Sequence, residues 1–197
     1  NLGQVVTGVE HELDAIDNRL ENIAFVKHYL QVLDSEEVRP GNVFRARDRT
    51  TNRFGVGDGV RYRFVEWLFA KVSYEYATRL PRPDELFGDN AFIYANLTLA
   101  PEVSHNLNVG LLVDAKQTST GAFRSSVNGF LREANDLIVL LGSDRQQTYQ
   151  NVYGARALGV EAAAGWTSLR EHLVLDANLT YQGFRNTSSK GTFGNFE

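Results

Sequence analysis

Residues 103–114, Val-Ser-His-Asn-Leu-Asn-Val-Gly-Leu-Leu-Val-Asp, decide the fold class because apolar and polar residues alternate along them. The apolar positions of this alternation are Val103, Leu107, Val109, Leu111 and Val113. Leu112, an apolar residue on the polar face, departs from the pattern. A period of two places the two sets on opposite faces of a β-strand. One face is therefore apolar, and the other is too polar to lie in the core of a β-sandwich.

The same alternation recurs in residues 5–14, 68–77 and 173–181, whereas helical periodicity is nearly absent. An all-β chain is therefore expected. With the weaker segments included, the pattern predicts about eight strands. They lie near residues 4–14, 21–33, 57–65, 68–78, 103–114, 122–135, 151–164 and 171–183.

The connections between these strands are alternately short and long. Short turns are expected at residues 15–20, 65–67, 115–121 and 165–170. Long polar loops are expected near residues 34–56, 79–102 and 136–150. Outer-membrane β-barrels have short periplasmic turns and long extracellular loops. The alternation therefore predicts an antiparallel transmembrane β-barrel segment whose long loops are extracellular. Both chain ends are then expected outside the cell, as in four hairpins taken from a larger barrel.

Composition excludes several other classes of protein. The chain has 197 residues, no cysteine and a net charge of −4. The missing cysteine excludes disulfide scaffolds and thiol nucleophiles, and the acidic balance argues against nucleic acid as a partner. His11, His28, His105 and His172 have no metal-ligand spacing. No nucleotide-binding or nucleophile motif is present, so we predict no enzyme activity, no catalytic residue, no metal and no cofactor.

Two ordered motifs resemble the barrel of TonB-dependent outer-membrane receptors. The first is an R-x-P-x-x-x-E-L-F stretch, which matches Arg79, Pro81, Glu85, Leu86 and Phe87. The second is an N-x-x-L-x-P-E-x-S-x-N-x-x-x-G stretch, which matches Asn96, Leu99, Pro101, Glu102, Ser104, Asn106 and Gly110. A weaker third similarity covers residues 151–161, where a strand ends in Gly-Val-Glu.

The resemblance implies a Gram-negative outer-membrane receptor with a barrel of roughly 22 strands filled by a plug domain. Such a receptor binds a scarce nutrient, namely an iron-siderophore, cobalamin or a glycan, and imports it with energy from the TonB complex. Residues 1–197 would then be part of that barrel, without the plug through which TonB acts. The lipid bilayer and lipopolysaccharide are the surroundings that such a barrel implies.

Two groups of residues are candidates for the functional site. Arg79, Pro81, Glu85, Leu86, Phe87, Asn96, Pro101 and Glu102 are expected to order a loop, because Pro81 and Pro83 fix φ and end the preceding strand. Four arginines in residues 45–53 are candidates for contact with an anionic substrate or with lipopolysaccharide. They are Arg45, Arg47, Arg49 and Arg53. A solvated loop without a ligand is the alternative for this group.

Two other classes of protein remain open at this point. About eight strands can close into a small self-contained barrel with a structural or adhesion role. A soluble β-sheet enzyme or lipocalin-like binder would place Leu107, Val109, Leu111 and Leu175 in a core rather than against lipid.

Overall fold

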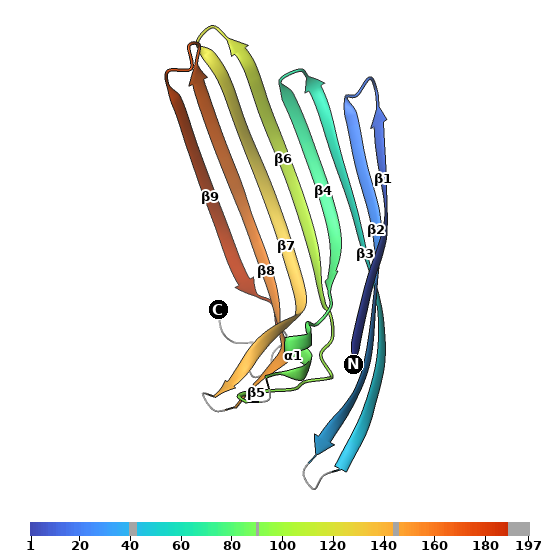
Figure 1. Ribbon diagram of the computed structural model, residues 1–197. Coiled ribbons are helices and arrows are strands. Elements are labelled where there is room, and N and C mark those ends of the chain that lie inside the picture. The colour runs from blue at the N-terminus through green and yellow to red at the C-terminus, as the bar shows by residue number, and fades with distance from the viewer. Residues whose placement is uncertain (40–42, 90, 144–145, 189–197) are drawn as a thin grey trace.

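The computed structural model describes residues 1–39, 43–89, 91–143 and 146–188 (Figure 1). It is almost entirely β-strand. The elements are β1 (Leu2–Ala15), β2 (Leu20–Arg39), β3 (Val43–Val65), β4 (Leu68–Arg79), α1 (Pro83–Phe87), β5 (Ile93–Tyr94), β6 (Glu102–Thr118), β7 (Gly121–Ser143), β8 (Gln146–Ser168) and β9 (Val174–Asn186). No helix in this part of the chain is long and apolar enough to cross a membrane.

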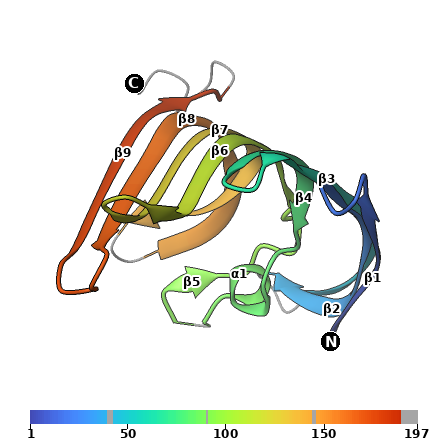
Figure 2. The same ribbon diagram turned by 90° about the horizontal axis from the view of Figure 1, so that it is seen from above.

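The long strands form one antiparallel meander in which each strand pairs with the next. The exception is β5, which lies in the connection between β4 and β6 and pairs in parallel with Gln147 and Thr148 of β8. Figure 2 shows that the sheet is strongly curved and that α1 and β5 lie on its concave side. Among the described residues β1 and β9 do not pair, so the curved sheet does not close on itself. A self-contained barrel of these strands would require that closure.

The predicted strands agree with the observed ones except at the long-loop end. The expected loops at 34–56 and 136–150 are wrong for most of their length. β2 runs on to Arg39 and β3 begins at Val43, while β7 ends at Ser143 and β8 begins at Gln146. The β2–β3 and β7–β8 pairings continue through these segments. The two strands of each hairpin satisfy each other's backbone hydrogen bonds, so the segments stay in strand conformation although their side chains are polar. The expected loop at 79–102 does leave the meander, and it contains α1 and β5.

The cross-strand register assigns the paired strand residues to two faces of the sheet. One face carries the cross-strand row of Val72, Val109 and Gly129 and the row of Leu111 and Val127. We call this apolar, convex face the outer face. Its side chains remain accessible, with Val109 51% and Leu111 54% exposed. The alternation that the sequence indicated is confirmed.

The opposite, concave face is the inner face, and it is predominantly polar. Its paired positions include Lys71 with Gly110, Asn106 with Arg132, and Asn128 with Glu161. A small cluster of buried leucines is also on this side, where the connection between β4 and β6 packs against β2. The cluster consists of Leu33, Leu86, Leu97 and Leu99. Among the described residues, the buried leucine cluster therefore lies where that connection covers the sheet.

Candidate functional site

The connection between β4 and β6, residues 80–101, contains α1 and β5, and we call it the inner loop. β4 ends at Arg79, and the loop enters α1 at Pro83, where a proline fits the first helical turn because its missing N–H is not needed there. The Glu85 carboxylate accepts a hydrogen bond from the Arg82 amide at 2.8 Å, which caps the helix start. Gly88 ends the helix with φ +66°, and a Cβ there would lie 2.0 Å from the Ile93 carbonyl oxygen. Only glycine fits this position.

A three-residue ionic cluster closes the base of the inner loop. The Arg79 guanidinium donates Nε and Nη2 to the two Glu102 oxygens, both at 2.6 Å. Its Nη1 donates to both Glu85 oxygens at 3.0 Å. The Ile138 amide of β7 donates to Glu102 at 2.7 Å. One arginine therefore joins the end of β4, the helix and the start of β6 through the bidentate geometry that guanidinium favours.

The charges in this cluster stabilise one another. The hydrogen bond to Glu102 is the main reason that the pKa of Arg79 lies above its usual range. Partial burial acts to raise the pKa of Glu102, but hydrogen bonds from Arg79 and from the Ile138 amide outweigh it and hold that pKa below its ordinary value. Both groups are therefore charged in the folded loop at neutral pH.

The inner loop is attached to the first three strands through its backbone carbonyls. Gln4 of β1 and Gln31 of β2 both donate to the Pro81 carbonyl oxygen, at 2.9 and 3.1 Å. Arg49 of β3 donates to the Leu99 carbonyl oxygen at 2.8 Å. These side chains reach across the concave space from strands that precede the loop by many residues.

On the other side, the inner loop is attached to β8. Asn151 accepts from the Ala100 amide at 2.7 Å and donates to the Ala100 carbonyl at 2.9 Å. Asn96 donates to the Tyr149 carbonyl at 2.7 Å, and its own oxygen accepts from the Thr98 amide. With β5 paired to β8 as well, the loop crosses the concave side from one wall of the sheet to the other (Figure 2).

The structure brings the predicted loop residues together. Arg79, Glu85 and Glu102 form the ionic cluster, and Leu86 and Phe87 pack with the leucine cluster. Pro81 and Asn96 carry anchoring hydrogen bonds, and Pro101 is buried. Sequence reasoning did not find the anchors Gln4, Gln31 and Asn151, because isolated amides in distant strands have no periodic or motif signal.

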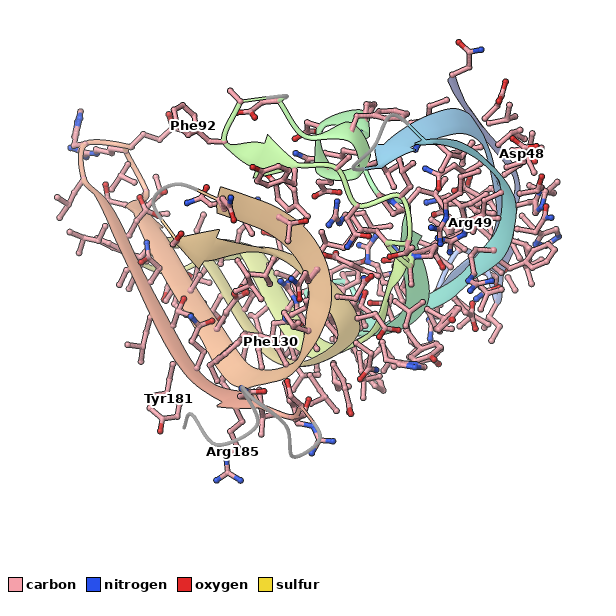
Figure 3. The ribbon with its side chains drawn as sticks, turned by 90° about the horizontal axis from the view of Figure 1, so that it is seen from below. Asp48, Arg49, Phe92, Phe130, Tyr181 and Arg185 are labelled. Atoms are coloured by element: carbon pink, nitrogen blue, oxygen red, sulfur yellow. The ribbon has the colours of Figure 1, made fainter. Side chains whose placement is uncertain are left out.

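The predicted arginine group lies on β3 rather than in a loop. Arg47, Arg49 and Arg53 occupy inner-face positions, opposite Ser35, Leu33 and Tyr29 of β2. Figure 3 shows Arg49 inside the curve of the sheet and its neighbour Asp48 outside. Burial lowers the pKa of Arg49, and the nearby positive charges of Arg53 and Arg47 lower it further. The Arg45 side chain lies outside the described residues.

The exposed surface of the inner loop is partly aromatic. Phe92 is 61% and Tyr94 54% exposed, and Figure 3 shows Phe92 projecting outward from the loop. Asp89 orders the turn that presents them, because its Oδ1 accepts from the amides of residues 91–93 at 2.8–2.9 Å. Those hydrogen bonds lower the pKa of Asp89. Within the described ranges, no group of His, Asp and Glu side chains is placed to hold a metal ion.

An antiparallel sheet with an apolar outer face and a polar inner face is the wall of a transmembrane β-barrel. Residues 31–196 match the family model described as TonB dependent receptor-like, beta-barrel. The chain therefore belongs to the β-barrel family of TonB-dependent receptors, which are outer-membrane proteins of Gram-negative bacteria.

Solved structures show the same fold at low sequence identity. The chain aligns with the copper transporter OprC at 18% identity and a TM-score of 0.72, covering 95% of this chain and 29% of OprC. The FrpB iron transporter from Neisseria meningitidis aligns at 17% identity and a TM-score of 0.66, covering 94% and 26%. The siderophore receptor PirA from Pseudomonas aeruginosa aligns at 17% identity and a TM-score of 0.59, covering 93% and 40%.

The chain thus spans less than a third of OprC and of FrpB, and two fifths of PirA. No curated protein sequence matches it.

Proposed function

We propose that this chain is a barrel portion of a receptor that binds a scarce nutrient outside the cell and imports it with TonB energy. The nutrient classes are an iron-siderophore, cobalamin or a glycan. The observation that carries the proposal is the inner loop, which crosses the concave side at the end of the long hairpins and is anchored to both walls. In a closed barrel the concave side is the lumen, so the loop narrows the lumen at its extracellular entrance.

Among these nutrients, the inner-face arginines favour an anionic iron chelate. Arg47, Arg49 and Arg53 lie along one strand on the lumen side, close enough for their charges to interact. A column of guanidinium groups attracts carboxylate or catecholate oxygens and binds them with charge-assisted hydrogen bonds. Arg49 donates to the loop, and we propose Arg47 and Arg53, which lie on either side of it on the same face, as the ligand contacts. The function is that of a receptor rather than an enzyme.

The test is uptake by the full-length receptor in cells that lack other receptors of this family. Labelled ferric chelates of negative, neutral and positive charge, cobalamin and oligosaccharides are offered with and without a proton-motive force. We expect energy-dependent uptake of an anionic chelate. We also expect binding to weaken about a hundredfold for Arg47→Gln combined with Arg53→Gln, because each of the two charged hydrogen bonds contributes about 1.5 kcal/mol.

The matched control is Arg61→Gln, on the inner face of the same strand but near the short-turn end, where Arg61 pairs with Glu21 at 2.9 Å. Its binding should equal that of the wild type. Energy-dependent uptake of a neutral glycan, unchanged by the arginine variants, would contradict the anionic-chelate proposal and leave the receptor proposal in place. Absence of energy-dependent uptake for every nutrient class would refute both.

A further inference from the structure

Arg49 lies where the arginines of β3 meet the inner loop. Arg47 and Arg53 share its face of the strand, one on either side of it. Its register partner on β2 is Leu33, and its side chain donates to the carbonyl oxygen of Leu99. Both leucines belong to the buried cluster under the loop. One side chain is therefore next to the proposed ligand contacts and to the loop at the same time.

The loop contact uses only part of the hydrogen-bonding capacity of Arg49. Nη1 makes it, at 2.8 Å, and a guanidinium group has five N–H donors in a fixed plane. Among the described residues, the Leu99 carbonyl is its hydrogen-bond partner and no carboxylate pairs with it. Guanidinium groups form their strongest hydrogen bonds with anions. Donors therefore remain for an anion while Nη1 stays on the loop.

The charges around Arg49 oppose the position of its side chain. Burial lowers the pKa of Arg49 most, and the positive charges of Arg53 and Arg47 lower it further. Like charges this close repel, and a neutral carbonyl does not cancel the repulsion. An anion among the three side chains replaces that repulsion with attraction. It holds Arg49 in place rather than drawing it away from the loop.

The peptide group that Arg49 holds is also held from the opposite wall. Its carbonyl, that of Leu99, accepts from Arg49 of β3 at 2.8 Å. Its N–H, that of Ala100, donates to Asn151 of β8 at 2.7 Å. A single peptide group therefore joins the two walls across the concave side of the sheet. Any change in the hold of Arg49 acts directly on the Ala100 amide.

We propose that Arg49 is a positioning residue that couples a bound anionic ligand to the inner loop, with Nη1 on the Leu99 carbonyl and its other donors on the ligand. This inference rests on the proposed function, because the ligand is the anion expected at Arg47 and Arg53. Ligand binding then strengthens the attachment of the loop to β3. Linked equilibria are reciprocal, so attachment of the loop strengthens ligand binding by the same factor. The loop at the lumen entrance is held most firmly when the ligand is present.

The test is hydrogen exchange of the full-length receptor, with citrate as the anionic probe and its uncharged ester triethyl citrate as the neutral probe. The reporter is the Ala100 amide, resolved by fragmentation of its peptide in the mass spectrometer. We expect saturating citrate to slow its exchange about tenfold in the wild type, which corresponds to about 1.4 kcal/mol. Triethyl citrate should leave the exchange unchanged. Arg49→Gln should exchange faster without citrate and should not be slowed by citrate at concentrations that saturate the variant.

Gln31→Ala is the matched control, because it removes another anchor of the inner loop, on the neighbouring strand, and leaves Arg49 in place. Its Ala100 amide should still be slowed about tenfold by citrate, which a general loosening of the loop would not allow. Should Arg49→Gln fail to fold, Arg49→Lys serves instead. An ammonium group lacks the planar fork that serves two acceptors, so this variant should lose most of the slowing.

Three results would overturn the coupling and leave the receptor proposal standing. They are citrate binding to the wild type without slower Ala100 exchange, equal slowing in Arg49→Gln, and loss of the slowing in Gln31→Ala. Absence of citrate binding to the wild type would overturn the coupling as well. The uptake of labelled nutrients decides the proposed function separately, because that experiment does not depend on citrate or on exchange of the loop.

Discussion

Replacing Arg79 with methionine tests the ionic cluster at the base of the inner loop. Methionine keeps most of the side-chain length but leaves the Glu85 and Glu102 carboxylates, which are 9% and 16% exposed, without their cation. Removing one partner of a buried ion pair costs about 3–5 kcal/mol. Because the Arg79 side chain is 36% exposed, water screens part of the interaction. We therefore expect a loss of about 2–3 kcal/mol in the free energy of local opening.

Hydrogen exchange followed by mass spectrometry on the full-length receptor measures this opening directly. A loss of 2–3 kcal/mol corresponds to about 30- to 150-fold faster exchange. The informative amides are those of Ile138, which donates to Glu102, and of Asn96, which donates to the Leu86 carbonyl. The strand amides of β1 and β2 should exchange as in the wild type.

The control is Arg61→Met, which removes an ion pair whose two side chains are 44% and 40% exposed. Its effect on exchange should be below about 1 kcal/mol, as for surface pairs in general. Exchange at Ile138 and Asn96 that changes less than threefold in Arg79→Met would refute the reasoning. Full recovery in Arg79→Lys would also refute it, because an ammonium group lacks the fork that binds both carboxylates at once.

Two further outcomes follow from the same loop. The pKa of Glu102 is lowered in the folded loop, so its stabilising effect is fully present above the ordinary glutamate pKa of about 4.3 and is lost as the pH falls through the lower folded value. The Ile138 amide, which donates to Glu102, should therefore exchange faster at pH 3 than at pH 6 after correction for intrinsic rates, and Glu102→Gln should reduce this difference. Leu99→Ala removes a side chain that is 2% exposed and should destabilise the loop by about 2–5 kcal/mol, measured as faster proteolysis of folded receptor. Leu169→Ala, at a position 68% exposed in a short hairpin, should not change the proteolysis rate.

Most of the sheet could be predicted from the sequence because the alternation of apolar and polar residues that marks a strand involves only neighbouring residues. Residues two apart share a face, so the alternation in residues 103–114 is sufficient to identify both the strand and its two environments. The strand ends near residues 34–56 and 136–150 were not predictable in this way. Outside the bilayer neither face has to be apolar, so the period of two fades although the hydrogen-bonded ladder continues.

The candidate site was predictable only in part. Arg79, Glu85 and Glu102 lie within one motif-bearing stretch, and their clustering follows from the prolines that turn the chain back. The contacts of Gln31 and Asn151 depend on the curvature of the whole sheet, which brings residues about 50 positions from the loop to its backbone. The sequence does not distinguish an Arg49 that contacts a ligand from an Arg49 that donates a hydrogen bond within the protein. Only the fold shows that its side chain donates to the Leu99 carbonyl.

The anchors of the inner loop have a consequence for engineering. Gln31, Arg49 and Asn151 recognise main-chain atoms of the loop and none of its side chains. Phe92 and Tyr94, which the loop presents to solvent, are therefore not needed for its attachment. A library that randomises these two positions while keeping Gly88 and Asp89 should retain the loop in place. The side chains at the tip of the loop can thus be exchanged while the base of the loop stays anchored to the sheet.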